Sequence, residues 1–225
     1  MQLSCIYISI IFVKIILMVK TAGLNFAYPG EKAFHFPDID LVPGEHLLIL
    51  GPSGVGKTTL LHLLSGILPA SKGTICINDV EITSLNRQRM DQFRGTHIGL
   101  IFQQYYFVKS LNAGENLQLR QSFPKSLQDK ERRQQLAARL GLTEHLKKKV
   151  TQLSQGQQQR LSIALGLIHK PKVVFADEPT SNLDDKNCGK VIQLLKDEAD
   201  ICESSLVIIT HDQRVSQHFK NQIVL

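Results

Sequence analysis

Residues 51–59 read Gly-Pro-Ser-Gly-Val-Gly-Lys-Thr-Thr, a glycine-rich stretch that ends in a lysine and two hydroxyl side chains. Glycines let successive backbone N–H groups curve around phosphate oxygens, and the lysine can then reach the β- and γ-phosphates of a nucleotide. The Thr58 hydroxyl is a ligand type that Mg²⁺ accepts. A strand-like run precedes this stretch and a helical pattern follows it. A glycine-rich turn with an incidental lysine would not account for these two flanking elements. We expect nucleotide contacts from Gly51, Pro52, Ser53, Gly54, Val55, Gly56, Lys57, Thr58 and Thr59.

Two adjacent carboxylates follow a second apolar run at residues 173–176. Asp177 ends this run, and an acidic side chain at the end of such a strand usually holds Mg²⁺, directly or through water. Glu178 comes next, where a carboxylate near the γ-phosphate can polarise an attacking water. Alone, the pair is compatible with two solvated carboxylates at a strand end. Together with residues 51–59, it predicts a P-loop nucleoside triphosphatase.

The stretch "LSQGQQQR" at residues 153–160 has the composition of a short glutamine tract but the pattern of a helix start. Ser154 is a favourable N-cap, and Gly156 permits close approach of the backbone to a ligand. The apolar helical pattern continues from there to Pro171, which cannot continue a helix. A helix N-terminus attracts anions, so the chain carries a second candidate phosphate site, far from Lys57 in sequence.

These motifs resemble those of the ATP-binding cassette (ABC) ATPases over roughly residues 19–225. "LSQGQ" is similar to the family signature L-S-G-G-Q, with Gln155 in place of the first glycine. Residues 181–184, "SNLD", resemble the D-loop. Three more positions match family residues in the expected order: Tyr28 the aromatic that stacks on adenine, Gln103 the Q-loop glutamine and His211 the switch histidine. Each of the three also has a structural explanation: a turn aromatic, a strand cap and a hydrogen-bonded polar residue.

The resemblance implies a dimer that closes around two ATP molecules. Each ATP is expected between residues 51–59 of one copy and Ser154, Gly156 and Gln157 of the other. The catalytic residues that the resemblance implies are Lys57, Gln103, Glu178 and His211, and the Mg²⁺ ligands are Thr58, Gln103 and Asp177. Glu178 is the expected base, while Lys57 and His211 are expected at the γ-phosphate.

Positioning these residues requires an α/β fold. Strand-like runs at residues 46–50, 74–78, 98–102, 173–176 and 206–210 alternate with helical or turn-rich segments, which predicts a P-loop NTPase core with a mainly parallel sheet. Ligands of such sheets bind at the carboxyl ends of the strands. The resemblance adds a small antiparallel β subdomain, to which residues 22–26 and 33–41 are suited. It also adds a helical signature subdomain at about 104–168, where Leu136 and Leu140 share a helix face.

Residues 1–18 are the least typical part of the chain. The apolar stretch from Cys5 to Met18 is interrupted by Lys14 and is shorter than the roughly 20 residues that a spanning helix needs. No basic n-region or cleavage site marks a signal peptide. The segment is a membrane-contacting extension, an additional β-rich segment, or upstream sequence included before a start at Met18. We favour the last interpretation, so the predicted ATPase domain is 19–225.

Composition narrows the range of partners. The 225 residues are 43% hydrophobic and 20% charged, as expected of one globular domain, and the net charge of +6 is scattered. No direct nucleic-acid contact is expected. Cys5, Cys76, Cys188 and Cys202 lack metal-ligand spacing and are expected to be free thiols.

The resemblance implies transmembrane permease subunits and a second ATP-binding subunit as partners, and a peripheral position at the cytoplasmic face of the cell membrane. The wording around residues 103–117 is most similar to the lipoprotein-release, macrolide-export and cell-division cassettes. The sequence does not identify the cargo, which the permease selects. Two alternatives remain: signalling through a membrane partner in cell division, and a non-transport ABC ATPase that acts on ribosomes or DNA.

Overall fold

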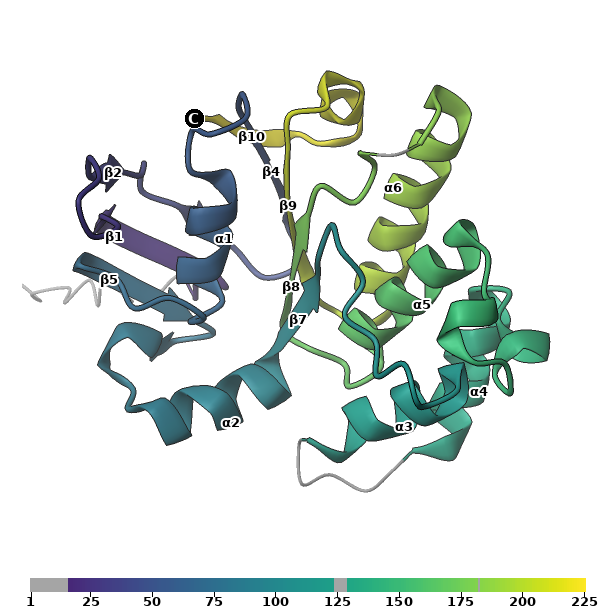
Figure 1. Cartoon of the computed structure of the whole chain (residues 1–225). Helices are drawn as coiled ribbons and strands as arrows, with labels where there is room; N and C mark the ends of the chain where they lie inside the picture. The colour runs from purple at the N-terminus through teal and green to yellow at the C-terminus, as the bar shows by residue number, and fades with distance from the viewer. Residues whose placement is uncertain (1–15, 124–128, 182) are drawn as a thin grey trace, which may run out of the picture.

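A five-stranded parallel sheet forms the centre of the molecule (Figure 1). The computed structural model describes residues 16–123, 129–181 and 183–225. The strand order is β10-β4-β9-β8-β7 and every neighbouring pair is parallel. The strands are β4 (His46–Leu50), β7 (Ile98–Ile101), β8 (Val173–Asp177), β9 (Ser205–Thr210) and β10 (Asn221–Val224). Their carboxyl ends therefore lie along one edge, where Gly51, Glu178 and His211 directly follow three of the strands.

A second, antiparallel sheet packs beside this core. It contains β1 (Val19–Phe26), β2 (Phe34–His35), β3 (Asp40–Leu41), β5 (Lys72–Ile77) and β6 (Val80–Glu81). The predicted strand at residues 74–78 exists, but assigning it to the parallel core was wrong, because β5 pairs antiparallel with β1 and β6. The fifth parallel strand is instead β10, which the sequence analysis missed. Only four residues long, with two of them exposed, β10 lacks the apolar run that marked the other strands.

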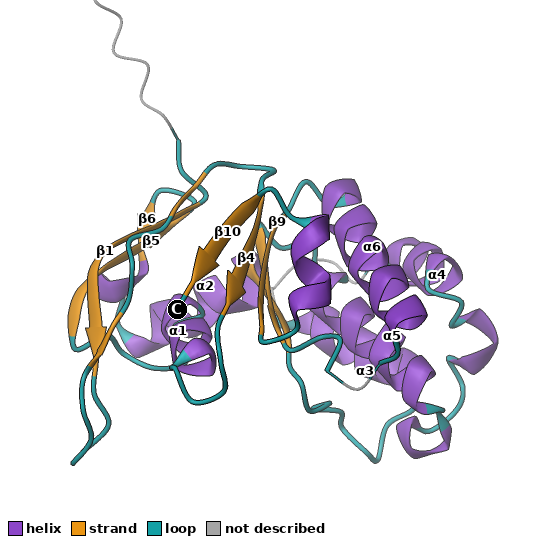
Figure 2. Cartoon of the chain, turned by 90° about the horizontal axis from the view of Figure 1, so that it is seen from above, coloured by secondary structure: helices purple, strands orange, loops and turns teal. Residues whose placement is uncertain are grey.

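Helices cover both faces of the parallel sheet (Figures 1 and 2). On one face α1 (Lys57–Leu64) and α2 (Arg87–His97) lie toward the antiparallel sheet, and on the other lie α5 (Gln155–Leu167) and α6 (Asp185–Ile201). Alternate residues of β4 pack into two different hydrophobic cores. Leu47 and Ile49 belong to the core that includes α1 and β1, and Leu48 and Leu50 belong to the core that includes α5 and α6. This period of two is the pattern of a strand that is buried on both faces.

The segment between β7 and β8 is largely helical. Besides α5 it holds α3 (Ala113–Ser122), α4 (Lys130–Arg139) and the short 3₁₀ turns η2 (Thr143–His145) and η3 (Val150–Gln152). Leu136 and Leu140 are both buried, as their shared face predicted. The separate helical subdomain at about 104–168 stays a prediction, because α5 also packs directly on β7: a Cβ added at Gly99 would lie 2.2 Å from the Gly166 carbonyl oxygen. Two further 3₁₀ turns are η1 (Ile82–Ser84) and η4 (Gln213–His218).

The N-terminal prediction falls mostly outside the described part of the chain, which begins at Ile16. Met18 is buried and its backbone N–H donates to the Leu41 carbonyl at 2.6 Å. Cys76, Cys188 and Cys202 are free thiols, as predicted, and Cys5 lies outside the described residues. None of the helices in the described ranges combines the length and apolar character that crossing a bilayer requires.

Candidate functional site

The glycine-rich loop joins β4 to α1 at the carboxyl edge of the parallel sheet. Gly56 is the N-cap of α1 and has φ of 101°, a left-handed backbone conformation that residues other than glycine rarely adopt. A Cβ there would also lie 2.7 Å from Cδ1 of Phe34. Glycine is therefore required at this position, and the free N–H groups of the first helical turn open toward the loop.

Lys57 is folded back over this loop and is almost entirely buried. Its Nζ donates to the carbonyl oxygens of Gly51 at 2.9 Å and Pro52 at 3.0 Å. The same nitrogen lies 3.8 Å from Oε1 of Glu178. The Lys57 ammonium group, which is predicted to bind phosphate, therefore lies between the phosphate loop and Glu178, the predicted base.

Thr58 and Asp177 meet as predicted for two ligands of one cation. The Thr58 hydroxyl donates to Oδ2 of Asp177 at 3.0 Å, while Oδ1 of Asp177 is buried with no hydrogen-bond partner. Burial raises the pKa of the Asp177 carboxyl above its ordinary value of 3.8; the Thr58 hydrogen bond opposes this rise and the nearby Glu178 adds to it. A buried carboxylate oxygen without a partner beside a hydroxyl is a hard-oxygen donor set that fits Mg²⁺.

The chain itself supplies few ligands at this position. Across the described ranges, no three His, Cys, Asp or Glu side chains cluster closely enough to hold a metal ion. Mg²⁺ bound at Thr58 and Asp177 would depend on phosphate oxygens and water for its remaining ligands, which is the usual arrangement at nucleotide sites. Bound there, it would neutralise charge on the phosphates.

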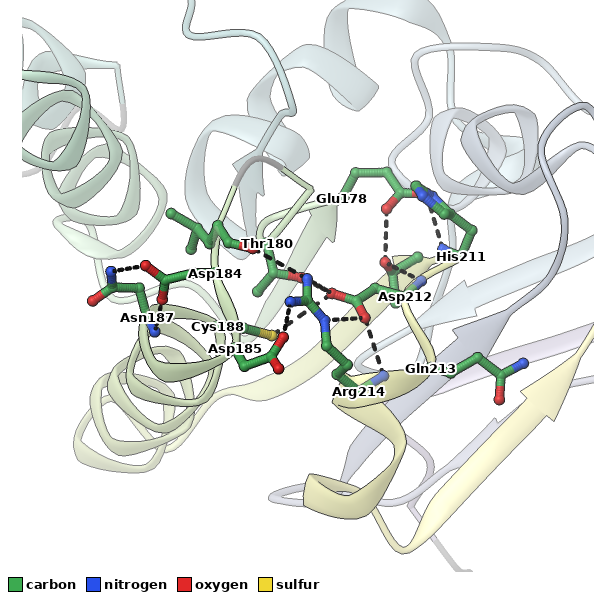
Figure 3. A network of polar contacts seen from close by, with 12 residues as sticks. Glu178, Thr180, Asp184, Asp185, Asn187, Cys188, His211, Asp212, Gln213 and Arg214 are labelled. Atoms are coloured by element: carbon green, nitrogen blue, oxygen red, sulfur yellow. Dashed lines mark hydrogen bonds and ion pairs between the residues drawn. The ribbon is translucent and has the colours of Figure 1, made fainter.

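Glu178 is fixed by the ends of two adjacent strands (Figure 3). Its Oε2 accepts from the Thr210 hydroxyl at 2.7 Å, and its Oε1 lies 2.7 Å from Nδ1 of His211 and accepts from the His211 backbone N–H at 3.0 Å. Glu178 has φ of 48°, a conformation that costs energy for a residue with a Cβ. Such strain persists only where neighbouring contacts hold the backbone, so β8 and β9 together set the direction of this carboxylate.

The predicted outer residues of the site have more mixed surroundings. The Tyr28 hydroxyl lies 3.3 Å from Oγ1 of Thr59, and its ring packs edge-on against Phe26 with centroids 4.8 Å apart. This places Tyr28 beside the phosphate-loop helix. Gln103 donates from Nε2 to the Ser181 hydroxyl at 3.4 Å. This hydrogen bond joins Gln103 to the segment after Glu178, and the role of Gln103 as a Mg²⁺ ligand stays a prediction.

The start of α5 has the predicted cap. Ser154 and Gln157 form a capping box: the Gln157 N–H donates to Oγ of Ser154 at 3.4 Å, and the Ser154 N–H donates to Oε1 of Gln157 at 2.9 Å. Nε2 of Gln157 lies 2.9 Å from Nε2 of His145. A Cβ added at Gly156 would meet nothing within 4 Å, so the backbone there is open to a ligand or partner. The hydrogen bonds of Ser154 and Gln157 stay within the helical segment and do not reach the phosphate loop.

The two remaining glutamines of the stretch, Gln158 and Gln159, make specific contacts. Gln158 donates from Nε2 to the carbonyl oxygens of Val150 at 3.2 Å and Leu153 at 3.1 Å. Gln159 donates from Nε2 to the Pro179 carbonyl at 2.6 Å, immediately after Glu178. Gln159 therefore joins α5 to the loop that carries the predicted base.

The sequence analysis also missed a polar network beside His211. Thr180, Asp212 and Arg214 connect the loop after β8 to the loop after β9. The one available signal was an acid directly after His211, with an arginine two residues later. Spacing alone does not show which segment such an ion pair holds.

Three features together define a P-loop nucleotide-binding protein. They are the parallel sheet, the glycine-rich loop at the N-terminus of α1, and the strand β8, which ends in Asp177. A family model described as ABC transporter matches residues 35–181. The chain is 35% identical to the lipoprotein-releasing system ATP-binding protein LolD of Legionella pneumophila, over 84% of each chain. It is 40% identical to the bacitracin export ATP-binding protein BceA of Halalkalibacterium halodurans, over 78% of this chain and 70% of that one.

Solved structures agree with these relatives. The dimeric ABC transporter cassette MJ0796 superimposes with a TM-score of 0.81 at 31% identity, covering 92% of this chain and 94% of that one. A post-hydrolysis state of the same cassette, bound to ADP and Pi, gives a TM-score of 0.79 at 32% identity, with the same coverage. This chain belongs to the ABC transporter family and is an ATP-binding cassette ATPase.

Proposed function

We propose that two copies of this chain close around two ATP molecules and that hydrolysis drives a separate membrane permease of the export or lipoprotein-release type. One observation carries the proposal. The carboxyl ends of β4, β8 and β9 bring Lys57, Asp177, Glu178 and His211 together around the phosphate loop. These groups would serve Mg²⁺-assisted phosphoryl transfer to water, whereas the hydrogen bonds of Ser154 in the same copy stay within its own helical segment. A second copy would supply that segment, and the dimeric cassette MJ0796 supports this arrangement.

In this arrangement the residues divide the work by chemistry. Lys57 and the N–H groups of residues 51–57 would hold the phosphates, and Thr58 and Asp177 would hold Mg²⁺. Glu178 would accept a proton from the attacking water, and His211 would contact the γ-phosphate. The bonds from Thr210 and His211 aim the Glu178 carboxylate, so little reorganisation is needed when water arrives.

Glu178→Gln tests the role of the base. The amide keeps the size of the side chain but cannot accept the proton, so turnover should fall by about 10²–10⁴-fold while ATP still binds. The variant should also accumulate as an ATP-bound dimer in size-exclusion chromatography. Asp40→Asn, which removes an exposed carboxylate, is the matched control. Hydrolysis by Glu178→Gln at close to the wild-type rate would show that another group is the base.

A groove beside residues 103–108 supports a permease as the partner. Its volume is about 670 Å³, and α2, β7, α3 and α5 line it together with this loop. Tyr106 at its edge is 72% exposed and Leu119 is 37% exposed. An apolar groove of this kind suits an amphipathic helix of a partner protein. The proposed position of the chain is accordingly peripheral, at the cytoplasmic face of the membrane.

The partner is tested by affinity purification from membranes of the source cells, with mass spectrometry of what is retained. A permease should be retained by the wild type and lost from Tyr106→Ser and Leu119→Ser, which lie outside the ATP site and should keep their ATPase activity in solution. A retained permease without cargo movement would favour signalling through a membrane partner. Recovery of ribosomes or DNA in its place would contradict the proposal.

A further inference from the structure

Asp212 and Arg214 form a two-point ion pair directly after the predicted switch histidine (Figure 3). Arg214 donates from Nε to Oδ1 of Asp212 and from Nη2 to Oδ2, each at 2.8 Å, and its backbone N–H donates to Oδ1 at 3.0 Å. Arg214 thereby lowers the pKa of the Asp212 carboxyl to about 2. The planar guanidinium fits a carboxylate in this forked geometry, so the pair fixes the direction of both side chains.

The same guanidinium also holds the loop that follows Glu178. Its Nη2 donates to the Leu183 carbonyl at 3.2 Å and its Nη1 pairs with the Asp185 carboxylate. Asp212 adds a second link, because its Oδ2 accepts from the Thr180 hydroxyl at 3.2 Å. The Asp212–Arg214 pair is therefore a clasp between the loop 211–214 and the residues Thr180, Leu183 and Asp185 that follow Glu178.

The clasp lies next to the contacts between Glu178 and His211. The His211 side chain is 52% exposed, so packing alone does not hold it in place. On one side of it Glu178 accepts from its backbone and ring, and on the other side Asp212 is fastened to Thr180 and Arg214. Displacement of Thr180, Leu183 or Asp185 would then pull on the clasp and move His211 with it.

We propose that Arg214 is a positioning residue that fixes His211 relative to Glu178 by clasping the two loops, an inference that rests on the proposed roles of those two residues in hydrolysis. The Arg214 side chain donates to Leu183, Asp185 and Asp212, and none of these residues belongs to the phosphate loop. It joins the two segments, so that the base and the switch histidine keep their mutual geometry when Leu183 and Asp185 are displaced.

Arg214→Met tests the clasp, because methionine keeps an unbranched apolar side chain and removes every guanidinium contact. We expect kcat for ATP hydrolysis to fall by about tenfold or more, the factor of one hydrogen bond between charged groups, while KM changes by less than about twofold. Arg214→Lys should recover part of the loss, since an ammonium can keep Asp212 but cannot also span to Leu183 and Asp185. Gln213→Ala, an exposed neighbour, is the matched control and should leave kcat and Tm unchanged.

A double-mutant comparison separates positioning from general stabilisation. If Arg214 acts through His211, Arg214→Met should cause little further loss in a His211→Ala background, measured by single-turnover phosphate release. The inference would be overturned by full additivity of the two substitutions or by an unchanged kcat in Arg214→Met. It would also be overturned if both Arg214→Met and Arg214→Lys lowered kcat and Tm and raised KM to the same extent. Wild-type hydrolysis by His211→Ala alone would refute the proposed role of His211, a failure distinct from that of the clasp.

Discussion

Replacing Asp177 by asparagine should stabilise the protein when no Mg²⁺ or nucleotide is bound. Asp177 is only 6% exposed, its Oδ1 has no partner, and Glu178 places a second negative charge beside it. The raised pKa of Asp177 shows that, in the fold, ionising this carboxyl costs more than it does in water, even with the Thr58 hydrogen bond. Asparagine keeps the shape and an acceptor for Thr58 but carries no charge.

The size of the gain follows from the cost of a buried polar atom without a partner. That cost is about 1–3 kcal/mol for a neutral atom and more for a charged one. The amide of the asparagine variant is neutral, so the variant keeps only the smaller cost. A net gain of about 1 kcal/mol corresponds to a rise in Tm of about 2–4 °C for a domain of this length. The assay is thermal unfolding in EDTA near neutral pH, with Asp40→Asn as the control for losing an exposed carboxylate.

Two changes of condition should reverse or remove the effect. A saturating ligand at 100 times its Kd adds about 2.7 kcal/mol, so Mg²⁺ and ATP should make the wild type the more stable protein if only Asp177 can hold the ion. Because the folded-state pKa is raised, the cost exists above that pKa and disappears as pH falls toward and below 3.8. A variant that melts at or below the wild-type temperature in EDTA, or a difference that does not change with pH, would refute this reasoning.

Two further predictions concern packing and the link between α5 and the site. Gly99→Ala should lower the free energy of unfolding, measured by urea titration, by about 1–3 kcal/mol, because its Cβ would lie 2.2 Å from a carbonyl oxygen of α5. In the same titration Gly95→Ala in α2 should be neutral or stabilising by up to about 1 kcal/mol, because the nearest atom to its Cβ would be the Phe123 carbonyl oxygen at 3.9 Å. Gln159→Leu should lower kcat about three- to tenfold with ATP affinity retained, because the hydrogen bond to the Pro179 carbonyl is lost. Gln158→Leu, whose bonds stay within the helical segment, should keep the wild-type kcat, and equal effects of the two substitutions would contradict the distinction.

The parts of the site that could be predicted are those in which one short segment carries the whole signal. The loop 51–57 and the pair Asp177 and Glu178 each combine a strand end with residues whose chemistry is specific, and the structure brings them together. Sheet membership was harder. The sequence shows that β5 is a strand but not that its partner is β1, because pairing depends on distant residues.

The missed contacts are also long-range. Gln159 reaches Pro179 and Arg214 reaches Leu183 across different elements, and a glutamine or arginine on a polar surface gives no sign of such a partner. The short strand β10 escaped for a related reason. Its four residues alternate between half-buried and exposed, and only the pairing with β4 makes it a strand.

The central position of β8 and β9 has a consequence for how the molecule opens. Every residue of both strands is buried, and each strand has a parallel neighbour on both sides. Backbone amides in such strands exchange with solvent only on global unfolding, whereas loops and edge strands open in local fluctuations. Asp177 and Thr210 thus end the segments that open last, while β10 at the sheet edge can fray without disturbing them. The frame that holds the two carboxylates persists through local fluctuations that release the outer parts of the fold.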